Sequence, residues 1–321
     1  METVSQPDQR SLLMPHRHSN QRNPTAQDFL LLHAVVIIWG LTAVLGKLIE
    51  LDSSVLVAWR TGLAAIGMAV WIAGRRQSLW PGLRAVLRIM LVGCMIGFHW
   101  FLFFLAAKLG PVSVALIGVA TCSLWCALLE PLFIQGKRIG GVELSLALVV
   151  VLGAAVIGFG DPVSWPCLLT GVAAAAVAAL FSYINNALVK DHNQSVITLY
   201  EMIGACLFMT ALSFTQPTTR SIPHGTEWIW MLVLSQICTV WAFSVYIGLL
   251  RRISVYVISL VSNLEPVWGI LLAGVIFGEY QKLNAWFWLG GVIVLAGIAS
   301  YPAACNWRNR RRPLLPESPS Q

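Results

Sequence analysis

The stretch "SNLEPVWGILLAGVIF", residues 262–277, places Glu265 and Pro266 side by side in a segment that is otherwise almost entirely apolar. A carboxylate is costly in apolar surroundings unless water, a partner or a proton relieves its charge. Proline removes a backbone N–H and disrupts the helical turn before it. The fold depends on whether this pair lies in a protein core or in a bilayer, and the rest of the chain answers that question.

The composition of the chain places this glutamate in a membrane. Hydrophobic residues make up 57% of the 321 residues, charged residues make up only 11%, and the mean hydropathy is +0.74. A soluble domain of ordinary composition carries about 25% charged residues. The chain is therefore predicted to be a membrane protein.

Apolar stretches recur along nearly the whole chain, each close to the ~20 residues that a helix needs to cross ~30 Å of hydrocarbon. We predict an all-α membrane protein with ten transmembrane helices, and the connectors between them are too short to form a second domain. The predicted spans are 28–48, 54–73, 86–107, 111–132, 141–160, 165–188, 194–214, 228–249, 254–277 and 283–303.

The distribution of Lys and Arg predicts the orientation, since short loops rich in these residues stay in the cytoplasm. With the amino terminus inside, sixteen basic residues fall on one side and four on the other, and Arg60 is left inside a span. Both termini are therefore expected in the cytoplasm, as a disordered tail over 1–27 and a basic tail over 305–321. Topology also explains the net charge of +7, so that no nucleic-acid partner is expected.

The second half of the chain repeats the first with an offset of about 141 residues. "SVLVAWRTGLAAIGMAV" from Ser54 aligns with "SVITLYEMIGACLFMTA" from Ser195, and neighbouring segments align in the same order. Five spans per half would make the two repeats, 28–160 and 161–304, inverted relative to each other. Such repeats are typical of transporters that bind substrate near the midplane. The alternative is a chance likeness between Ala- and Gly-rich helices.

Three motifs make the chain resemble the EamA-type branch of the drug/metabolite transporter superfamily. They are "IIWGLTAVLGKL" in the first span, "LVAWRTGLAAI" in the second, and "NLEPVWGILLAGVIFGEYQKLNAWFWLGGVIVLAGI" across the last two. The resemblance covers about residues 30–303. It implies a multi-pass carrier of the plasma (inner) membrane that moves small metabolites, commonly amino acids or related amphipathic compounds, outward.

Glu265 is the first candidate site residue. It lies eleven residues into the ninth span, at a depth of about 16 Å, close to the midplane. We interpret it as a residue of the transport route that binds a cationic or amino group or titrates a coupling proton. The alternative is a neutral glutamate that holds open, by hydrogen bonding, the helix kink expected at Pro266.

Two further ionisable residues are candidates at other depths. His99 lies near the depth of Glu265 and could relay protons, although a histidine among aromatic residues is more often a packing residue. Arg60 is a candidate carboxylate anchor or external gate, because a guanidinium pairs bidentately and stays charged. Its alternatives are snorkelling outward or pairing with Glu50 or Asp52. Glu201 is expected in an inner vestibule or at the interface.

Trp39 and Trp268 are the two aromatic residues expected to line a cavity, with ordinary packing as the alternative for each. The small-residue run "LGGVIVLAGIA" in the tenth span favours tight packing inside the bundle or a homodimer contact.

No motif indicates catalysis, a metal or a cofactor. The chain lacks HExxH, GxSxG, GxGxxG and P-loop signatures, and its seven cysteines show no metal-ligand spacing. We therefore predict a secondary transporter, most simply an exporter working by alternating access, whose partners are a small-molecule substrate and the lipid bilayer. Proton-coupled antiport, with protons as the coupling ion, and uncoupled facilitated export are both left open by the sequence. An intramembrane enzyme and a membrane scaffold are the alternatives.

Overall fold

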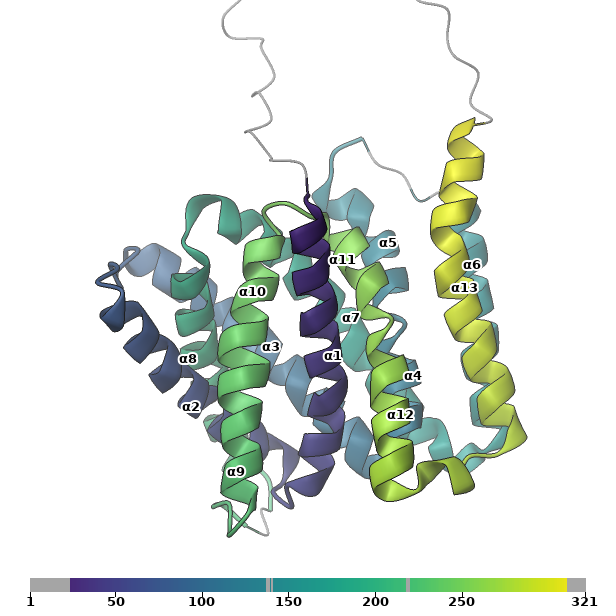
Figure 1. The fold of residues 1–321 in the computed structure, drawn as a ribbon, viewed down its shortest axis with the longest axis horizontal. Coiled ribbons are helices and arrows are strands. Elements are labelled where there is room, and N and C mark those ends of the chain that lie inside the picture. The colour runs from purple at the N-terminus through teal and green to yellow at the C-terminus, as the bar shows by residue number, and fades with distance from the viewer. Residues whose placement is uncertain (1–23, 137–138, 140, 218–219, 311–321) are drawn as a thin grey trace, which may run out of the picture.

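The computed structural model describes residues 24–136, 139, 141–217 and 220–310, and within them the chain is all-helical without a β-strand (Figure 1). The elements in chain order are α1 (Ala26–Leu48), α2 (Ser53–Gly74), α3 (Leu83–Leu109), α4 (Val112–Val119), α5 (Cys122–Phe133), α6 (Gly141–Gly160), η2 (Pro162–Ser164), α7 (Trp165–Asp191), α8 (Gln194–Ser213), α9 (Glu227–Leu232), η3 (Val233–Trp241), α10 (Ala242–Leu249), α11 (Val255–Ser262), α12 (Glu265–Phe277), η4 (Glu279–Gln281) and α13 (Ala285–Arg310).

The prediction of an all-α membrane protein is confirmed. Among the described residues, eight helical stretches are long and apolar enough to cross a membrane, and shorter apolar stretches lie in α6 and α13. Three of the predicted spans are composite: the fourth is α4 followed by α5, the eighth is α9, η3 and α10, and the ninth is α11 followed by α12. Most of the two predicted tails, residues 1–23 and 311–321, lies outside the described residues, and α13 extends helically to Arg310.

The ends of several helices are set by local side-chain caps. Thr25 and Asp28 form a reciprocal capping box at the start of α1, where Thr25 N–H donates to the Asp28 carboxylate at 2.9 Å. Asn193 caps α8 and Ser254 caps α11 by accepting a backbone N–H. Each cap satisfies one of the four free N–H groups at a helix start. The helix starts are therefore encoded in short polar residues between the apolar spans.

Two of the composite spans are broken at corresponding points. α4 and α11 begin 143 residues apart, at 112 and 255, and α5 and α12 also begin 143 residues apart, at 122 and 265. α4 packs against α12, whereas α5 packs against α11 (Figure 1). Since the first piece of each broken span lies beside the second piece of the other, the two spans run antiparallel and their breaks meet at mid-depth.

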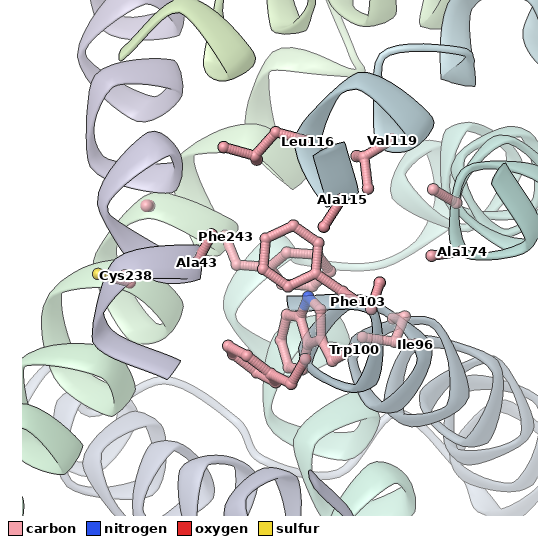
Figure 2. Close-up of a cluster of buried hydrophobic side chains, with 14 of the residues drawn as sticks. Ala43, Ile96, Trp100, Phe103, Ala115, Leu116, Val119, Ala174, Cys238 and Phe243 are labelled. Atoms are coloured by element: carbon pink, nitrogen blue, oxygen red, sulfur yellow. The ribbon is translucent and has the colours of Figure 1, made fainter. Parts of the chain in front are cut away.

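A cluster of buried apolar side chains surrounds this meeting point (Figure 2). Trp100 and Phe103 project from α3 toward Phe243 of α10, and the Trp100 and Phe243 rings lie edge to face with centroids 5.6 Å apart. Ala115 and Val119 of α4 lie against the same aromatic residues. Edge-to-face pairs contribute about 0.5–1.5 kcal/mol in addition to the stabilisation from the apolar area that they bury. This cluster therefore stabilises the packing of α3, α4 and α10 against one another.

The last helices of the two halves, α6 and α13, form a pair at the edge of the bundle (Figure 1). Their backbones approach at two glycines. A Cβ on Gly153 would lie 2.9 Å from the Gly290 carbonyl oxygen, and a Cβ on Gly290 would lie 2.5 Å from the Gly153 carbonyl oxygen. Only glycine permits this approach, which is the usual role of small residues between membrane helices. The pairing of α6 with α13 therefore depends on both glycines.

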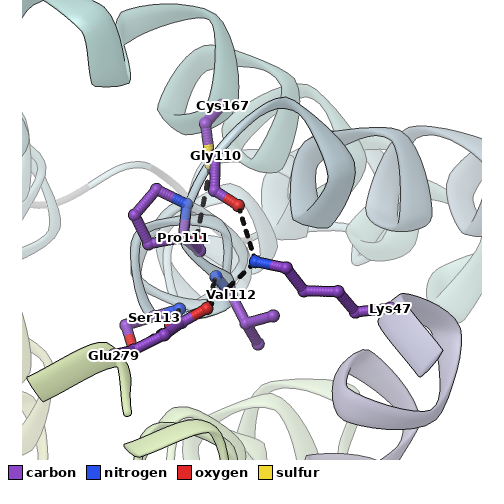
Figure 3. A network of polar contacts seen from close by, with 7 residues as sticks. All are labelled: Lys47, Gly110, Pro111, Val112, Ser113, Cys167 and Glu279. Atoms are coloured by element: carbon purple, nitrogen blue, oxygen red, sulfur yellow. Dashed lines mark hydrogen bonds and ion pairs between the residues drawn. The ribbon is translucent and has the colours of Figure 1, made fainter. Parts of the chain in front are cut away.

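At one end of the bundle, Glu279 of η4 holds the start of α4 (Figure 3). Its carboxylate accepts hydrogen bonds from Val112 N–H at 2.9 Å, from Ser113 N–H at 3.1 Å, from the Ser113 hydroxyl at 2.9 Å and from Lys47 Nζ at 3.1 Å. Burial disfavours the charged form of this group, but the hydrogen bonds and Lys47 outweigh burial and hold the pKa of Glu279 below its usual range. The carboxylate thus replaces the missing acceptors of a helix start on a neighbouring span.

The opposite end of α1 is held by a different ion pair. Arg252, in the turn before α11, donates from Nη1 to Asp28 Oδ1 at 2.6 Å. Because Lys47 lies in the last turn of α1 and Asp28 in its first, α1 is joined at both ends to the second half of the chain.

Candidate functional site

A central cavity lies where the two helix breaks meet, and its volume is about 100 Å³. The residues of both breaks line it, together with residues of α1, α2, α3, α7 and α10. Among the lining residues are four predicted site residues and the predicted kink residue, namely Trp39, Arg60, His99, Glu265 and Pro266.

Glu265 is the first residue of α12, directly after the break at 263–264. Pro266 follows in the first turn of the new helix, where a missing N–H is tolerated. Among the described residues, the Glu265 carboxylate forms no hydrogen bond and no ion pair, and it interacts with Arg60 through space. The cavity therefore contains a carboxylate whose oxygens are not hydrogen-bonded to any described residue.

Arg60 of α2 supplies the opposite charge. Its side chain is 2% exposed, Nε donates to Thr239 Oγ1 at 2.8 Å, and the guanidinium carbon lies 3.8 Å from the centre of the Trp100 ring. The two terminal nitrogens donate to no described residue. Thr239 belongs to η3, a π-helical segment, and its hydroxyl donates to the Leu234 carbonyl. π-Helical turns often occur at functional sites, and this one orients the acceptor that fixes Arg60.

His99 of α3 is held in one tautomer when it is neutral. Nδ1 lies 2.8 Å from the Ala174 carbonyl oxygen, which can only accept, so Nδ1 carries the hydrogen. Nε2 is then the acceptor of the neutral ring. The ring packs between aromatic neighbours, with its centre 5.5 Å from that of Phe181. The histidine therefore combines the packing role weighed from the sequence with one free acceptor.

The two tryptophans expected at a cavity are placed differently. Trp39 of α1 lines the central cavity and its ring lies 5.3 Å from that of Tyr246. Trp268 of α12 is not a lining residue and its side chain is 41% exposed. A binding role for Trp268 stays a prediction from the sequence.

Two polar contacts at the cavity were not predicted from the sequence. Asn263 Nδ2 donates to Ser123 Oγ at 3.0 Å, which joins the break before α12 to the start of α5. Tyr246 donates to Ser182 Oγ at 2.7 Å, and both residues line the cavity. Asn263 stands two residues before the Glu265–Pro266 pair, so its place beside a predicted break was the available signal. Nothing in the sequence marked Tyr246 or Ser182.

The site holds ionisable and aromatic groups. Within the described part of the chain, no group of three or more His, Cys, Asp or Glu side chains could hold a metal ion. A buried cation, a free carboxylate and an aromatic wall can instead bind a small amphipathic molecule.

A bundle of apolar helices with two antiparallel broken spans around a central cavity defines the class of multi-pass membrane transporters. The family model of the EamA-like transporter family matches residues 28–159 and again residues 165–301. The chain belongs to this family, and the predicted family resemblance is confirmed.

Similarity to individual proteins is more distant. A solved structure described only as the crystal structure of a protein superimposes with a TM-score of 0.65 at 18% sequence identity, covering 90% of this chain and 100% of that chain. At this identity the likeness shows a shared fold. No curated protein matches the chain.

Proposed function

We propose that the chain is a secondary transporter that exports small amphipathic metabolites, of which amino acids are the best candidates, by alternating access at the central cavity. The observation that carries the proposal is the presence of both Arg60 and Glu265 in the lining of one cavity. Both are ionisable, and neither the terminal nitrogens of Arg60 nor the Glu265 carboxylate is bonded to a described residue. Buried charges are normally paired, so the cavity has spare capacity for a ligand that carries both charges.

The chemistry of a zwitterion fits this pair of residues. The planar guanidinium of Arg60 can donate two parallel hydrogen bonds to a carboxylate. The Glu265 carboxylate can accept from an ammonium group. The aromatic rings of Trp39, Trp100 and Phe181 supply an apolar surface for the rest of the ligand. An α-amino acid with an apolar side chain presents these three features on one small molecule.

The ion pairs at the two ends of α1 support alternating access. α1 is held to the second half of the chain at one end by the Lys47–Glu279 pair and at the other by the Asp28–Arg252 pair. Opening the cavity to one side needs the pair on that side to separate while the other stays closed. The antiparallel packing of the broken spans supports inverted repeats, and the charge count supports an inner-membrane orientation with both termini in the cytoplasm. Release away from the cytoplasm then follows from the outward-facing state.

Protons are the proposed coupling ion. Within the described part of the chain Glu265 forms no ion pair, and Nε2 of His99 is the acceptor of the neutral ring in the same cavity. Binding of an amino group at Glu265 would compete with a proton there, which is the requirement for exchange of substrate against protons. No observation on the described residues favours an intramembrane enzyme or a scaffold over a transporter.

Counterflow in liposomes tests the proposal. Purified protein is reconstituted with a panel of unlabelled amino acids, amines and nucleobases inside, and uptake of the labelled compound is measured with and without a pH gradient. Glu265→Gln and Glu265→Ala are compared with Glu130→Gln, a carboxyl-to-amide change at a partly exposed residue of α5 that does not line the cavity. We expect counterflow of amino acids in wild type and in Glu130→Gln, and a loss of counterflow or of its pH dependence in both Glu265 variants. Unchanged rate and pH dependence in both would refute the role of Glu265.

A further inference from the structure

A second buried acid lies outside the central cavity. Glu201 of α8 is 0% exposed, and neither of its carboxylate oxygens has a hydrogen-bond partner among the described residues. It does not line the cavity. The position differs from the inner vestibule or interface expected from the sequence, because α3 closes over it: a Cβ on Gly93 would lie 2.2 Å from the Glu201 carbonyl oxygen. The absence of a side chain at Gly93 lets the two helices touch and excludes water from Glu201.

Asn185 of α7 is the polar group that faces Glu201. It is also 0% exposed, and no residue that the structure describes forms a hydrogen bond with its Oδ1 or its Nδ2. A neutral carboxylic acid and a primary amide are matched, since the acid O–H can donate to Oδ1 while Nδ2 donates to the acid carbonyl. An ionised carboxylate can accept from Nδ2 but leaves Oδ1 without a donor. The addition of one proton therefore completes the pair.

Polar side chains connect this pair to the central cavity. Ser182 precedes Asn185 by three residues on α7, so the two lie on the same face of the helix, one turn apart. Ser182 lines the cavity and accepts the hydroxyl of Tyr246, which also lines it. Tyr246 interacts electrostatically with Glu201. The route from Glu201 to the cavity thus passes only one helical turn of α7.

Polar side chains also connect Glu201 to the end of the bundle where α8 begins. Gln194, Thr198 and Glu201 are spaced by four and three residues and share one face of α8. The Thr198 hydroxyl donates to the Gln194 carbonyl at 3.0 Å and lies 3.4 Å from the hydroxyl of Ser244. Thr198 is fully buried, whereas Gln194 is partly exposed. The series Gln194, Thr198, Glu201, Asn185 and Ser182, here called the polar file, spans from that end to the cavity.

No described cation neutralises Glu201 from the helices packed around it. On α10 the titratable group is Tyr246. On α3 it is the thiol of Cys94, which lies 3.7 Å from the Gly204 carbonyl oxygen. The other buried ionisable groups of α3 and α2 are turned elsewhere, His99 toward the Ala174 carbonyl and Arg60 toward Thr239. A lone charge at full burial is unstable in a membrane and is usually neutralised by a proton.

We propose that Glu201 is a proton-binding site separate from the central cavity, and that the polar file carries the proton between the cavity and the end of the bundle where α8 begins. This inference rests on the proposed transport function. The step is a proton transfer alone: the Glu201 carboxylate accepts a proton that reaches it along one half of the file and releases it along the other. Coupling follows because the neutral acid and the ionised acid bond differently to Asn185 on α7, the helix that also lines the cavity.

Glu201→Gln separates proton coupling from substrate binding. The glutamine amide resembles the protonated acid in shape and can still bond to Asn185, so the variant is expected to fold. In liposomes containing a pH-sensitive dye, we expect the proton movement that follows substrate addition to be lost, while counterflow without a gradient continues at the wild-type rate. Glu130→Gln is the matched control and should retain both. Proton movement that persists in Glu201→Gln would overturn the proposal.

Infrared spectroscopy of the purified protein gives a signal that would not change with pH or substrate if Glu201 had a purely structural role. We expect a protonated-carboxyl band that is absent in Glu201→Gln and that changes in wild type with pH and with substrate. A band constant under all conditions would show a permanently neutral structural acid and overturn the inference. Accumulation driven by a sodium gradient in place of a pH gradient, and lost in Glu201→Gln, would assign Na⁺ to the site and also overturn it. Absence of counterflow in wild type would instead refute the transport function, and the pH response of the band would still test proton binding.

Discussion

Glu279→Gln is expected to destabilise the protein more than any change at its charged partner Lys47. The carboxylate is 2% exposed and accepts four hydrogen bonds at the start of α4 (Figure 3). Glutamine retains one acceptor oxygen but places an amide donor where the carboxylate accepted from Ser113. The remaining bonds change from charged to neutral, a loss of about 1 kcal/mol, and the buried Ser113 N–H without an acceptor costs a further 1–3 kcal/mol or so. The expected total is about 2–4 kcal/mol.

Lys47 should contribute much less to this network. Its side chain is 32% exposed, so that solvent screens its charge, and an ion pair of this kind is worth at most about 1 kcal/mol. Thermal unfolding in detergent, followed by tryptophan fluorescence at a fixed scan rate, compares Glu279→Gln with Lys47→Met. At roughly 2 °C per kcal/mol, Glu279→Gln should unfold about 4–8 °C below wild type and Lys47→Met within about 2 °C of it. Glu50→Gln, an exposed acid at the same end, is the control and should not shift the transition. The reasoning is refuted if Lys47→Met is the more damaging change.

The same network predicts an acid dependence of stability. The pKa of Glu279 is lower in the folded protein than in the unfolded chain, so its contribution is complete at neutral pH. The contribution is lost as the pH falls from the usual glutamate value of about 4.3 through the lowered pKa. The difference in unfolding temperature between wild type and Glu279→Gln should therefore narrow on acidification. A difference that stays constant down to the lowest pH at which the protein is folded would contradict this assignment.

Three other changes have expected outcomes. Arg60→Lys keeps the charge but loses the planar fork and the Nε bond to Thr239, so amino-acid counterflow should fall about tenfold or more, and an unchanged rate would exclude bidentate binding. Gly153→Leu places atoms against the Gly290 carbonyl oxygen and should destabilise the protein by about 1–3 kcal/mol, visible as a lower unfolding temperature; an unshifted transition would show that α6 and α13 can separate freely. Arg252→Gln removes a cation that is 48% exposed and should change stability by less than about 1 kcal/mol, so a larger shift in the unfolding transition would show that solvent does not screen this pair.

Much of the fold could be predicted from the sequence because crossing a bilayer imposes a length and a polarity on each helix. The apolar spans, the all-helical class and the family all follow from that constraint and from local motifs. The breaks inside spans were harder to predict. Pro266 marked one of them, but the break between α4 and α5 carries no proline at its start, and it became visible only from its packing against α11 and α12.

The candidate site could be predicted only in part, because depth along a helix says nothing about which neighbours a side chain meets. The depth of Arg60 suggested an outer gate, whereas the structure brings it to the same cavity as Glu265. Glu201 was expected near water, and its burial depends on a contact with Gly93 that no local pattern reveals. Glu279 lies in a connector and looked ordinary, since its hydrogen-bond partners are far away in the sequence.

The glycine contact between α6 and α13 bears on how the protein is made. Each of these helices ends one family repeat, and each has the other as its main neighbour. During synthesis α6 enters the bilayer before any part of the second repeat exists, so its glycine face must wait against lipid until the last helix of the chain is inserted. The fold is therefore complete only after α13 has been inserted. A nascent chain stalled before Ala285 would expose the glycine face of α6 to quality-control proteases.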